Sequence, residues 1–178
     1  MGEPRAGAIA LYFAHVVAER LLPLVPREER VLDFGDRPGR VGQNLEAAGI
    51  RVVRSLLAES DEAGLRYGGA YAEVHDWPVA RSRARGLAER LPAGTPVLVR
   101  LERRPGQSAA AVVRDLGPAF FWKRAVGLGL LVPAEEQSPW AESHPHAFAV
   151  LAALEGLVRA WPGFRLRGRD AVLLGVRR

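Results

Sequence analysis

Residues 31–40 read Val-Leu-Asp-Phe-Gly-Asp-Arg-Pro-Gly-Arg, an apolar run that ends in a glycine-containing turn. The run predicts a buried strand over 30–35, and the residues after it predict a helix over 41–48 that Gly49 ends. In doubly wound sheets, ligands bind at such strand-to-helix turns, because glycines let a ligand approach the backbone and the first helical amides lack partners. The alternative is that Gly35 and Gly39 serve only the tight turn itself.

Strands and helices alternate along the rest of the chain. We expect helices over 7–22, 79–91, 107–131 (in two pieces) and 146–160, and strands over 50–57, 71–75, 96–101, 164–167 and 171–176. This alternation predicts an α/β fold, a doubly wound three-layer sandwich with a mostly parallel sheet and helices on both faces. The last two predicted strands must be antiparallel, because three residues cannot form a parallel crossover.

The length of 178 residues is typical of one domain, so we treat 1–178 as one unit with an N-terminal helical segment over 1–28. A proline-rich stretch over 133–146 is long enough to act as a lid loop. The sequence has no cysteine, which excludes a disulfide scaffold, a thiolate metal site and a cysteine nucleophile. No apolar run approaches the ~18–20 residues of a membrane span, and the first residues lack a secretory pattern. We therefore expect a cytoplasmic protein without a membrane partner.

Positive charge is concentrated in two segments. The net charge is +5, and 24 of the 25 basic residues are arginine. Residues 81–104 hold seven arginines against two glutamates, and residues 159–178 hold six arginines against one aspartate. If the fold brings the two segments together, they form an anion-binding patch suited to nucleic acid; otherwise they are ordinary solvated faces. Phe120, Phe121 and Trp122, followed by two cations, are a further candidate for stacking on nucleic acid, with Trp122 as the surface residue.

The sequence resembles class I S-adenosylmethionine-dependent methyltransferases. The first motif of that family runs apolar-apolar-Asp-apolar-Gly-x-Gly-x-Gly, and Asp33, Gly35 and Gly39 match it. The order of the predicted elements is similar to the seven-stranded sheet of the family, whose last strand inserts antiparallel. The resemblance implies a Rossmann-like methyltransferase fold with S-adenosylmethionine as cofactor. It also implies that Gly35 and Gly39 line the methionine part, and that Asp33 holds the turn and contacts the amino group of the cofactor.

The sequence departs from the family pattern at three places. Arg37 replaces the middle glycine, so a long cation enters the cofactor turn. The second strand lacks the acid that binds the ribose hydroxyls, and Ser55 and Glu59 are the nearest candidates beside the adenosine. The chain between the second and third predicted strands is too short for the usual helix, strand and loop. We therefore expect one edge strand to be missing.

Candidate substrate and catalytic residues follow the third predicted strand. Asp76 and Trp77 lie where the family places its substrate, with Asp76 as proton acceptor or amine ligand and Trp77 as a stacking surface. His75 is a second candidate base. The alternative is that Asp76-Trp77-Pro78 forms only a turn. His144 and His146 flank a proline, which favours the start of a helix over a metal site, so no metal is expected.

These observations predict a methyltransferase whose methyl acceptor is unknown and whose catalytic base is not fixed. Two alternatives stay open. The first alternative is an inactive scaffold on the same fold, for example a homodimer. The second is a nucleotide- or RNA-binding module that uses Arg37 and the two arginine-rich segments.

Overall fold

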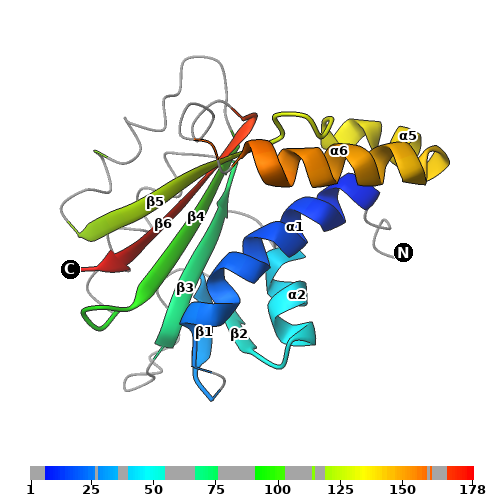
Figure 1. Ribbon diagram of the computed structural model, residues 1–178. Helices are drawn as coiled ribbons and strands as arrows, with labels where there is room; N and C mark the ends of the chain where they lie inside the picture. Colours follow the sequence, from blue (N-terminus) through cyan, green and yellow to red (C-terminus); the bar gives the residue numbers. More distant parts are fainter. Residues whose placement is uncertain are drawn as a thin grey trace.

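The computed structural model describes residues 7–26, 28–35, 40–54, 67–75, 91–102, 114, 119–159, 161 and 168–178. These residues form a six-stranded sheet in the order β2-β1-β3-β4-β6-β5 (Figure 1). The strands are β1 (Arg30–Asp33), β2 (Arg51–Arg54), β3 (Tyr67–Val74), β4 (Pro96–Glu102), β5 (Phe120–Leu128) and β6 (Asp170–Arg177). In the described part of the chain, the sheet ends at β2 on one side and at β5 on the other.

The sheet is mixed, as the sequence predicts. The pairs β1/β2, β1/β3 and β3/β4 are parallel. Strand β6 is antiparallel to both β4 and β5. The prediction of a mostly parallel sheet with an antiparallel C-terminal strand is therefore confirmed.

Both faces of the sheet are buried, because successive side chains of each strand enter different cores. Leu32, Ala70 and Val99 belong to the core on one face. Val31, Tyr71 and Leu98, each adjacent in sequence to one of these residues, belong to the core on the other face. Two buried faces confirm the predicted α/β three-layer arrangement.

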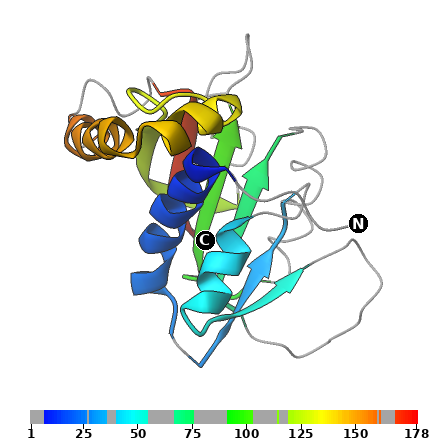
Figure 2. The same cartoon turned by 90° about the vertical axis from the view of Figure 1, so that its right-hand side faces the viewer.

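Helices α1 (Ala8–Leu21) and α2 (Arg40–Ala47) cover the second face, as Figures 1 and 2 show. The predicted N-terminal helical segment contains α1 and a single turn, η1 (Leu22–Leu24). Helix α2 ends where the sequence predicts, because Gly49 takes a φ of 85° and the Ile50 amide donates to the Leu45 carbonyl.

The prediction of a helix over 107–131 is wrong for its second half, which forms strand β5. The segment offers only short apolar runs, Phe120–Trp122 and Ala125–Leu128, and such runs do not distinguish a strand from a helix by periodicity alone. As an edge strand with a register shift between Trp122 and Arg124, β5 exposes Phe121 and Arg124 to solvent. The sequence predicted Trp122 as the surface aromatic residue of this segment, but Trp122 is half-buried against the core. The exposed aromatic residue is Phe121.

Residues 164–167, the predicted hairpin partner of the last strand, lie outside the described part of the chain; strand β6 itself has β4 on one side and β5 on the other. The expected lid loop over 133–146 is instead largely helical, with η2 (Glu135–Gln137), α5 (Ser138–Ser143) and the start of α6 (Pro145–Val158). No helix among the described residues combines the length and the apolar character that crossing a membrane requires.

Candidate functional site

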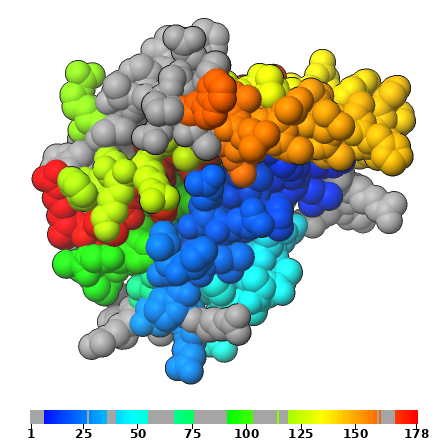
Figure 3. Space-filling model, viewed as in Figure 1, coloured from blue at the N-terminus to red at the C-terminus, as the bar shows by residue number. Residues whose placement is uncertain are grey.

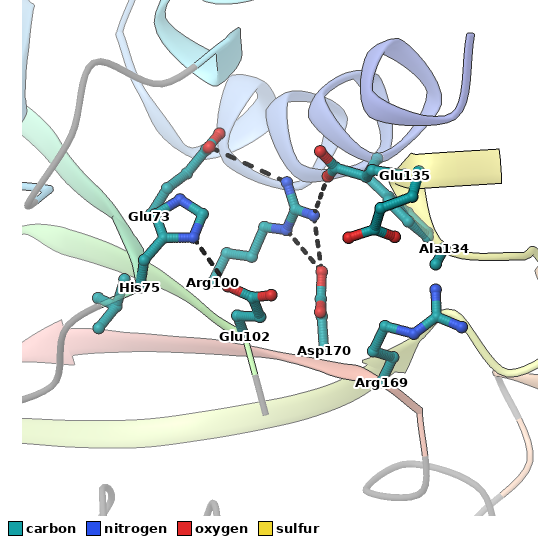
Figure 4. Close-up of a pocket in the computed structure, with 11 residues that line it drawn as sticks. Glu73, His75, Arg100, Glu102, Ala134, Glu135, Arg169 and Asp170 are labelled. Carbon is teal, nitrogen blue, oxygen red and sulfur yellow. Dashed lines mark hydrogen bonds and ion pairs between the residues drawn. The ribbon is translucent and has the colours of Figure 1, made fainter. Parts of the chain in front are cut away.

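A cavity of about 240 Å³ lies where the parallel strands β3 and β4 end (Figure 4). Strand β6 begins at the same edge because it runs antiparallel, with Asp170 opposite Glu102 of β4. The side chains around the cavity come from α1, β3, β4, η2 and β6 and from residues directly beside these elements: Phe13, Glu73, Val74, His75, Arg100, Glu102, Ala134, Glu135, Glu136, Arg169 and Asp170. The fold therefore places polar side chains that are distant in sequence at the carboxyl edge of the sheet, where α/β proteins bind ligands.

The turn after β1 adjoins this edge. Asp33 is buried, and its Oδ1 accepts a hydrogen bond of 3.0 Å from the Gly35 amide. A methyl group at Gly35 would lie 3.0 Å from the carbonyl oxygen of Glu73, so a larger residue would crowd the backbone of β3. This geometry gives Asp33 the turn-holding position that the family resemblance implies. Arg37 and Gly39 lie outside the described residues, as do Ser55 and Glu59.

Arg100 is the central charge of the cavity wall. Its Nε and one terminal nitrogen donate to Asp170 Oδ2 at 2.9 and 2.7 Å, and the same terminal nitrogen donates to Glu135 at 2.8 Å. The guanidinium also lies 5.2 Å from the centre of the Phe13 ring, a cation–π arrangement. Burial alone would lower the pKa of Arg100, but the surrounding carboxylates outweigh burial, so its pKa is raised and the group stays charged.

Glu73 connects the cavity to the start of α2. One carboxylate oxygen accepts a 3.2 Å hydrogen bond from the Val41 amide in the first turn of α2, where a negative charge is favourable. The other oxygen lies 3.9 Å from Arg100. Burial raises the pKa of Glu73 above its ordinary value, although Arg100 and the Val41 amide oppose the shift.

His75, a candidate base in the sequence, lies in the cavity wall. Its Nδ1 is 2.9 Å from Glu102 Oε2, and both side chains are partly exposed. A carboxylate on one imidazole nitrogen fixes the tautomer and makes the other nitrogen the proton acceptor. Figure 4 shows this pair beside the Arg100 cluster. Asp76 and Trp77, the predicted substrate residues, lie outside the described part of the chain.

The lining of the cavity is negatively charged overall. It contains five carboxylates, from Glu73, Glu102, Glu135, Glu136 and Asp170, against the two guanidinium groups of Arg100 and Arg169. A surplus of carboxylates favours cationic ligands over anionic ones. This sign is opposite to the one that a phosphate-binding site would need.

The arginine-rich segments contribute to the interior as well as to the surface. Arg100 belongs to the basic segment 81–104 but is buried among carboxylates, so it is not available to nucleic acid. In the segment 159–178, Arg177 donates to the carbonyl oxygens of Ala119 and Arg178. Residues 81–90, 103–104 and 162–167 lie outside the described residues, so convergence of the two segments stays a prediction.

The predicted helix start at His144 and His146 is confirmed, since α6 begins at Pro145. His144 stacks on Trp140 and hydrogen-bonds to the Trp140 carbonyl. Within the described residues, no group of three His, Asp or Glu side chains is arranged to hold a metal ion.

Sequence reasoning missed Glu73, Arg100, Glu102, Glu135 and Asp170 as site residues. The usable signal is a charged residue inside an apolar strand, as in Val99-Arg100-Leu101 and Ala72-Glu73-Val74. Such a residue is buried only with a partner, and the partners here are far apart in sequence.

Comparisons with known proteins agree on the fold. A scan against models of protein families finds no match, and a search of curated proteins finds no significant relative. Among solved structures, a TehB-like SAM-dependent methyltransferase from Corynebacterium glutamicum is similar with a TM-score of 0.53 and 12% identity, over 93% of this chain and 88% of that chain. The [4+2]-cyclase SpnF is similar with a TM-score of 0.52 and 15% identity, over 93% of this chain and 80% of that chain.

The order of strands, the antiparallel last strand and these likenesses agree with one another. The chain has the fold of the SAM-dependent methyltransferases.

Proposed function

We propose that the protein is a SAM-dependent methyltransferase that binds its cofactor over the turn after β1 and its methyl acceptor in the cavity between β3, β4 and β6. One observation carries the proposal: the turn after β1, which the Asp33–Gly35 hydrogen bond holds, lies next to an acidic cavity at the carboxyl edge of the sheet. Asp33, Gly35, Arg37, Gly39, Ser55 and Glu59 are the proposed cofactor contacts.

The chemistry of the cavity suits S-adenosylmethionine, whose reacting group is a cationic sulfonium. The carboxylate surplus stabilises a positive charge next to the site of transfer. The volume of about 240 Å³ is below the ~300–1,000 Å³ of pockets that enclose whole drug-sized ligands. We therefore assign the cavity to the acceptor and the reacting end of the cofactor, not to its adenosine part.

When bound, S-adenosylmethionine supplies an electrophilic methyl group, whose bond pair stays on sulfur as the acceptor's lone pair forms the new bond. The residues of the chain position the acceptor and receive its proton. We assign the proton to His75, because its imidazole lies in the cavity wall and is paired with the Glu102 carboxylate. The acidic lining favours an acceptor that carries an amine over one that carries a phosphate or carboxylate. Asp76 and Trp77 are proposed to complete the acceptor site.

Calorimetry with S-adenosylmethionine and S-adenosylhomocysteine tests cofactor binding. We expect both to bind, and we expect Arg37→Gly to strengthen binding, because a guanidinium in this turn opposes a cationic cofactor. No heat with either compound at millimolar concentration would overturn the methyltransferase proposal. It would favour the alternative of an inactive scaffold on the same fold.

Methyl transfer to a panel of small amines, followed by release of S-adenosylhomocysteine, tests the role of His75. His75→Gln should lower turnover by about 10²–10⁴-fold with little change in cofactor affinity. His15→Gln is a matched control, since His15 also contacts a glutamate, Glu19 at 3.1 Å, but lies exposed on α1. Equal turnover in the two variants would exclude His75 as the base.

The same purified protein also serves to test two alternative functions. The likeness to a cyclase shows that this fold also supports proteins named for other reactions, so fold alone does not fix the activity. An RNA-binding role through the segments 81–104 and 159–178 predicts affinity that falls steeply with salt. A cytoplasmic location is part of the proposal, and cell fractionation tests it.

A further inference from the structure

Among the described residues, helix α6 packs on the rest of the protein along one stripe. Phe148 meets Tyr12 edge to face at 5.8 Å between ring centres, and the Tyr12 hydroxyl donates to the Ala152 carbonyl. One turn further, Glu155 is the only fully buried residue of the helix. These residues follow each other at intervals of four and three, which places them on one face.

A second apolar stripe lies on the opposite side of α6. Ala147, Val150, Leu154 and Leu157 recur at intervals of three, four and three, the spacing of a coiled-coil seam. All are exposed: 58% for Val150, 45% for Leu154 and 67% for Leu157. Figures 1 and 3 show α6 at the surface, extending past the end of the sheet. A helix that is apolar on both sides is typically buried on both sides.

The chemistry of the outer stripe selects an apolar partner. Within α6 the only Asp, Glu, Lys or Arg is Glu155, which faces inward. The positions beside the stripe are His146, Leu151, Ala153 and Val158. Helices that bind anionic membrane surfaces carry lysine and arginine on their polar face, and nucleic-acid surfaces need the same charges. Neither kind of surface matches this helix.

We propose that two copies of the chain pair through α6, antiparallel and around a two-fold axis near Leu154, to form a homodimer. A two-fold interface places the same patch on both sides, so an uncharged apolar stripe is complementary to itself. The small residues Ala147 and Ala153 let the two helices approach closely.

The available area sets the strength of this dimer. A 14-residue helix is about 21 Å long and roughly 11 Å wide with its side chains, so half its surface is roughly 350 Å² per copy. An apolar groove beside the stripe, lined in part by Leu131, Pro133, Trp140 and Leu151, adds to it. The sum falls short of the ~800 Å² per partner of a standard interface. We therefore expect a dimer that dissociates in the micromolar range.

Sedimentation velocity over the micromolar range tests the pairing. The native protein should pass from monomer to dimer as concentration rises, and Leu154→Glu should stay monomeric. Leu24→Glu is the matched control, because Leu24 is also 45% exposed but lies on η1. It should dimerise like the native protein. A native protein that stays monomeric, or a Leu154→Glu variant that still dimerises, would overturn the proposal.

Because the sequence has no cysteine, single-cysteine variants give a second and milder test. Leu154→Cys should form a disulfide-linked dimer under mild oxidation, since the two copies meet near the two-fold axis. Leu24→Cys should remain largely unlinked. Equal cross-linking of the two variants would refute the α6 interface. Cofactor binding is measured separately, so failure of the dimer leaves the proposed activity untouched.

Discussion

Replacing Glu155 by glutamine should destabilise the protein strongly although the two side chains have nearly the same shape. The buried carboxylate accepts three backbone hydrogen bonds, from Gly129 at 2.8 Å, Leu131 at 3.0 Å and Val132 at 2.8 Å. It thereby holds the chain between β5 and η2. A glutamine side chain has only one acceptor oxygen. Its NH₂ group would face a backbone N–H, and since both are donors, no hydrogen bond forms between them.

The magnitude follows from this count. One buried amide left without an acceptor costs about 1–3 kcal/mol, and the other two hydrogen bonds lose the extra strength of a charged acceptor. We expect a loss of about 3 kcal/mol in the free energy of unfolding. At about 2–4 °C per kcal/mol for a chain of this length, the melting temperature should fall by about 6–12 °C.

Thermal unfolding followed by circular dichroism measures this shift. Glu136→Gln is the control, because Glu136 is an exposed acid on η2, the element that follows the segment held by Glu155. Hydrogen exchange adds a local readout, since the amides of Gly129, Leu131 and Val132 should exchange faster in Glu155→Gln. A melting temperature equal to that of Glu136→Gln, or unchanged exchange at these amides, would refute the reasoning.

Three further substitutions test the site. Gly35→Ala should lower stability by about 1–3 kcal/mol in urea unfolding, because its methyl group meets the backbone of β3; Gly156→Ala, which has open space around the added carbon, is the control and should not destabilise. Arg100→Met should cost about 3–5 kcal/mol, because Asp170 and Glu73 lose their cation; a loss below about 1 kcal/mol would contradict a buried ion cluster. Folding raises the pKa of Glu73, so its contribution to the free energy of unfolding is greatest below its unfolded pKa and is lost as the pH rises through its folded pKa. Glu73→Gln should therefore reduce the fall in the free energy of unfolding between acidic and neutral pH, and an unchanged pH profile would argue against the shift.

The sequence predicted those elements whose signal is local. Strands β1 and β4 are short apolar runs, and Gly49 ends α2 as expected. Strand β5 was mistaken for a helix, because what makes it a strand is its pairing with β6, about fifty residues later in the chain. Tertiary pairing of this kind is not visible in the local pattern.

The same difference between local and long-range signals applies to the predicted site residues. Asp33 and Gly35 were predicted because their motif is contiguous, and the Gly35 amide does donate to Asp33 in the structure. Their contact with a cofactor stays a prediction. The Arg100 cluster was not identified, since Arg100 and Asp170 are 70 residues apart and the apolar strand around Arg100 does not indicate which residue pairs with it. For that reason, the count of arginines in 81–104 placed Arg100 on a basic surface, whereas the structure buries it in an acidic cavity.

Glu73 makes the two halves of the proposed site mechanically dependent on each other. Its backbone limits the space at Gly35, one carboxylate oxygen holds the first turn of α2, and the other faces Arg100 in the cavity. A change in the Arg100 cluster therefore reaches the cofactor turn through a single rigid strand residue. If the turn and the cavity hold the cofactor and the acceptor, Arg100→Met should weaken cofactor binding even though Arg100 is not a proposed cofactor contact. Glu19→Gln, at an exposed acid of α1 that does not line the cavity, should leave cofactor affinity unchanged.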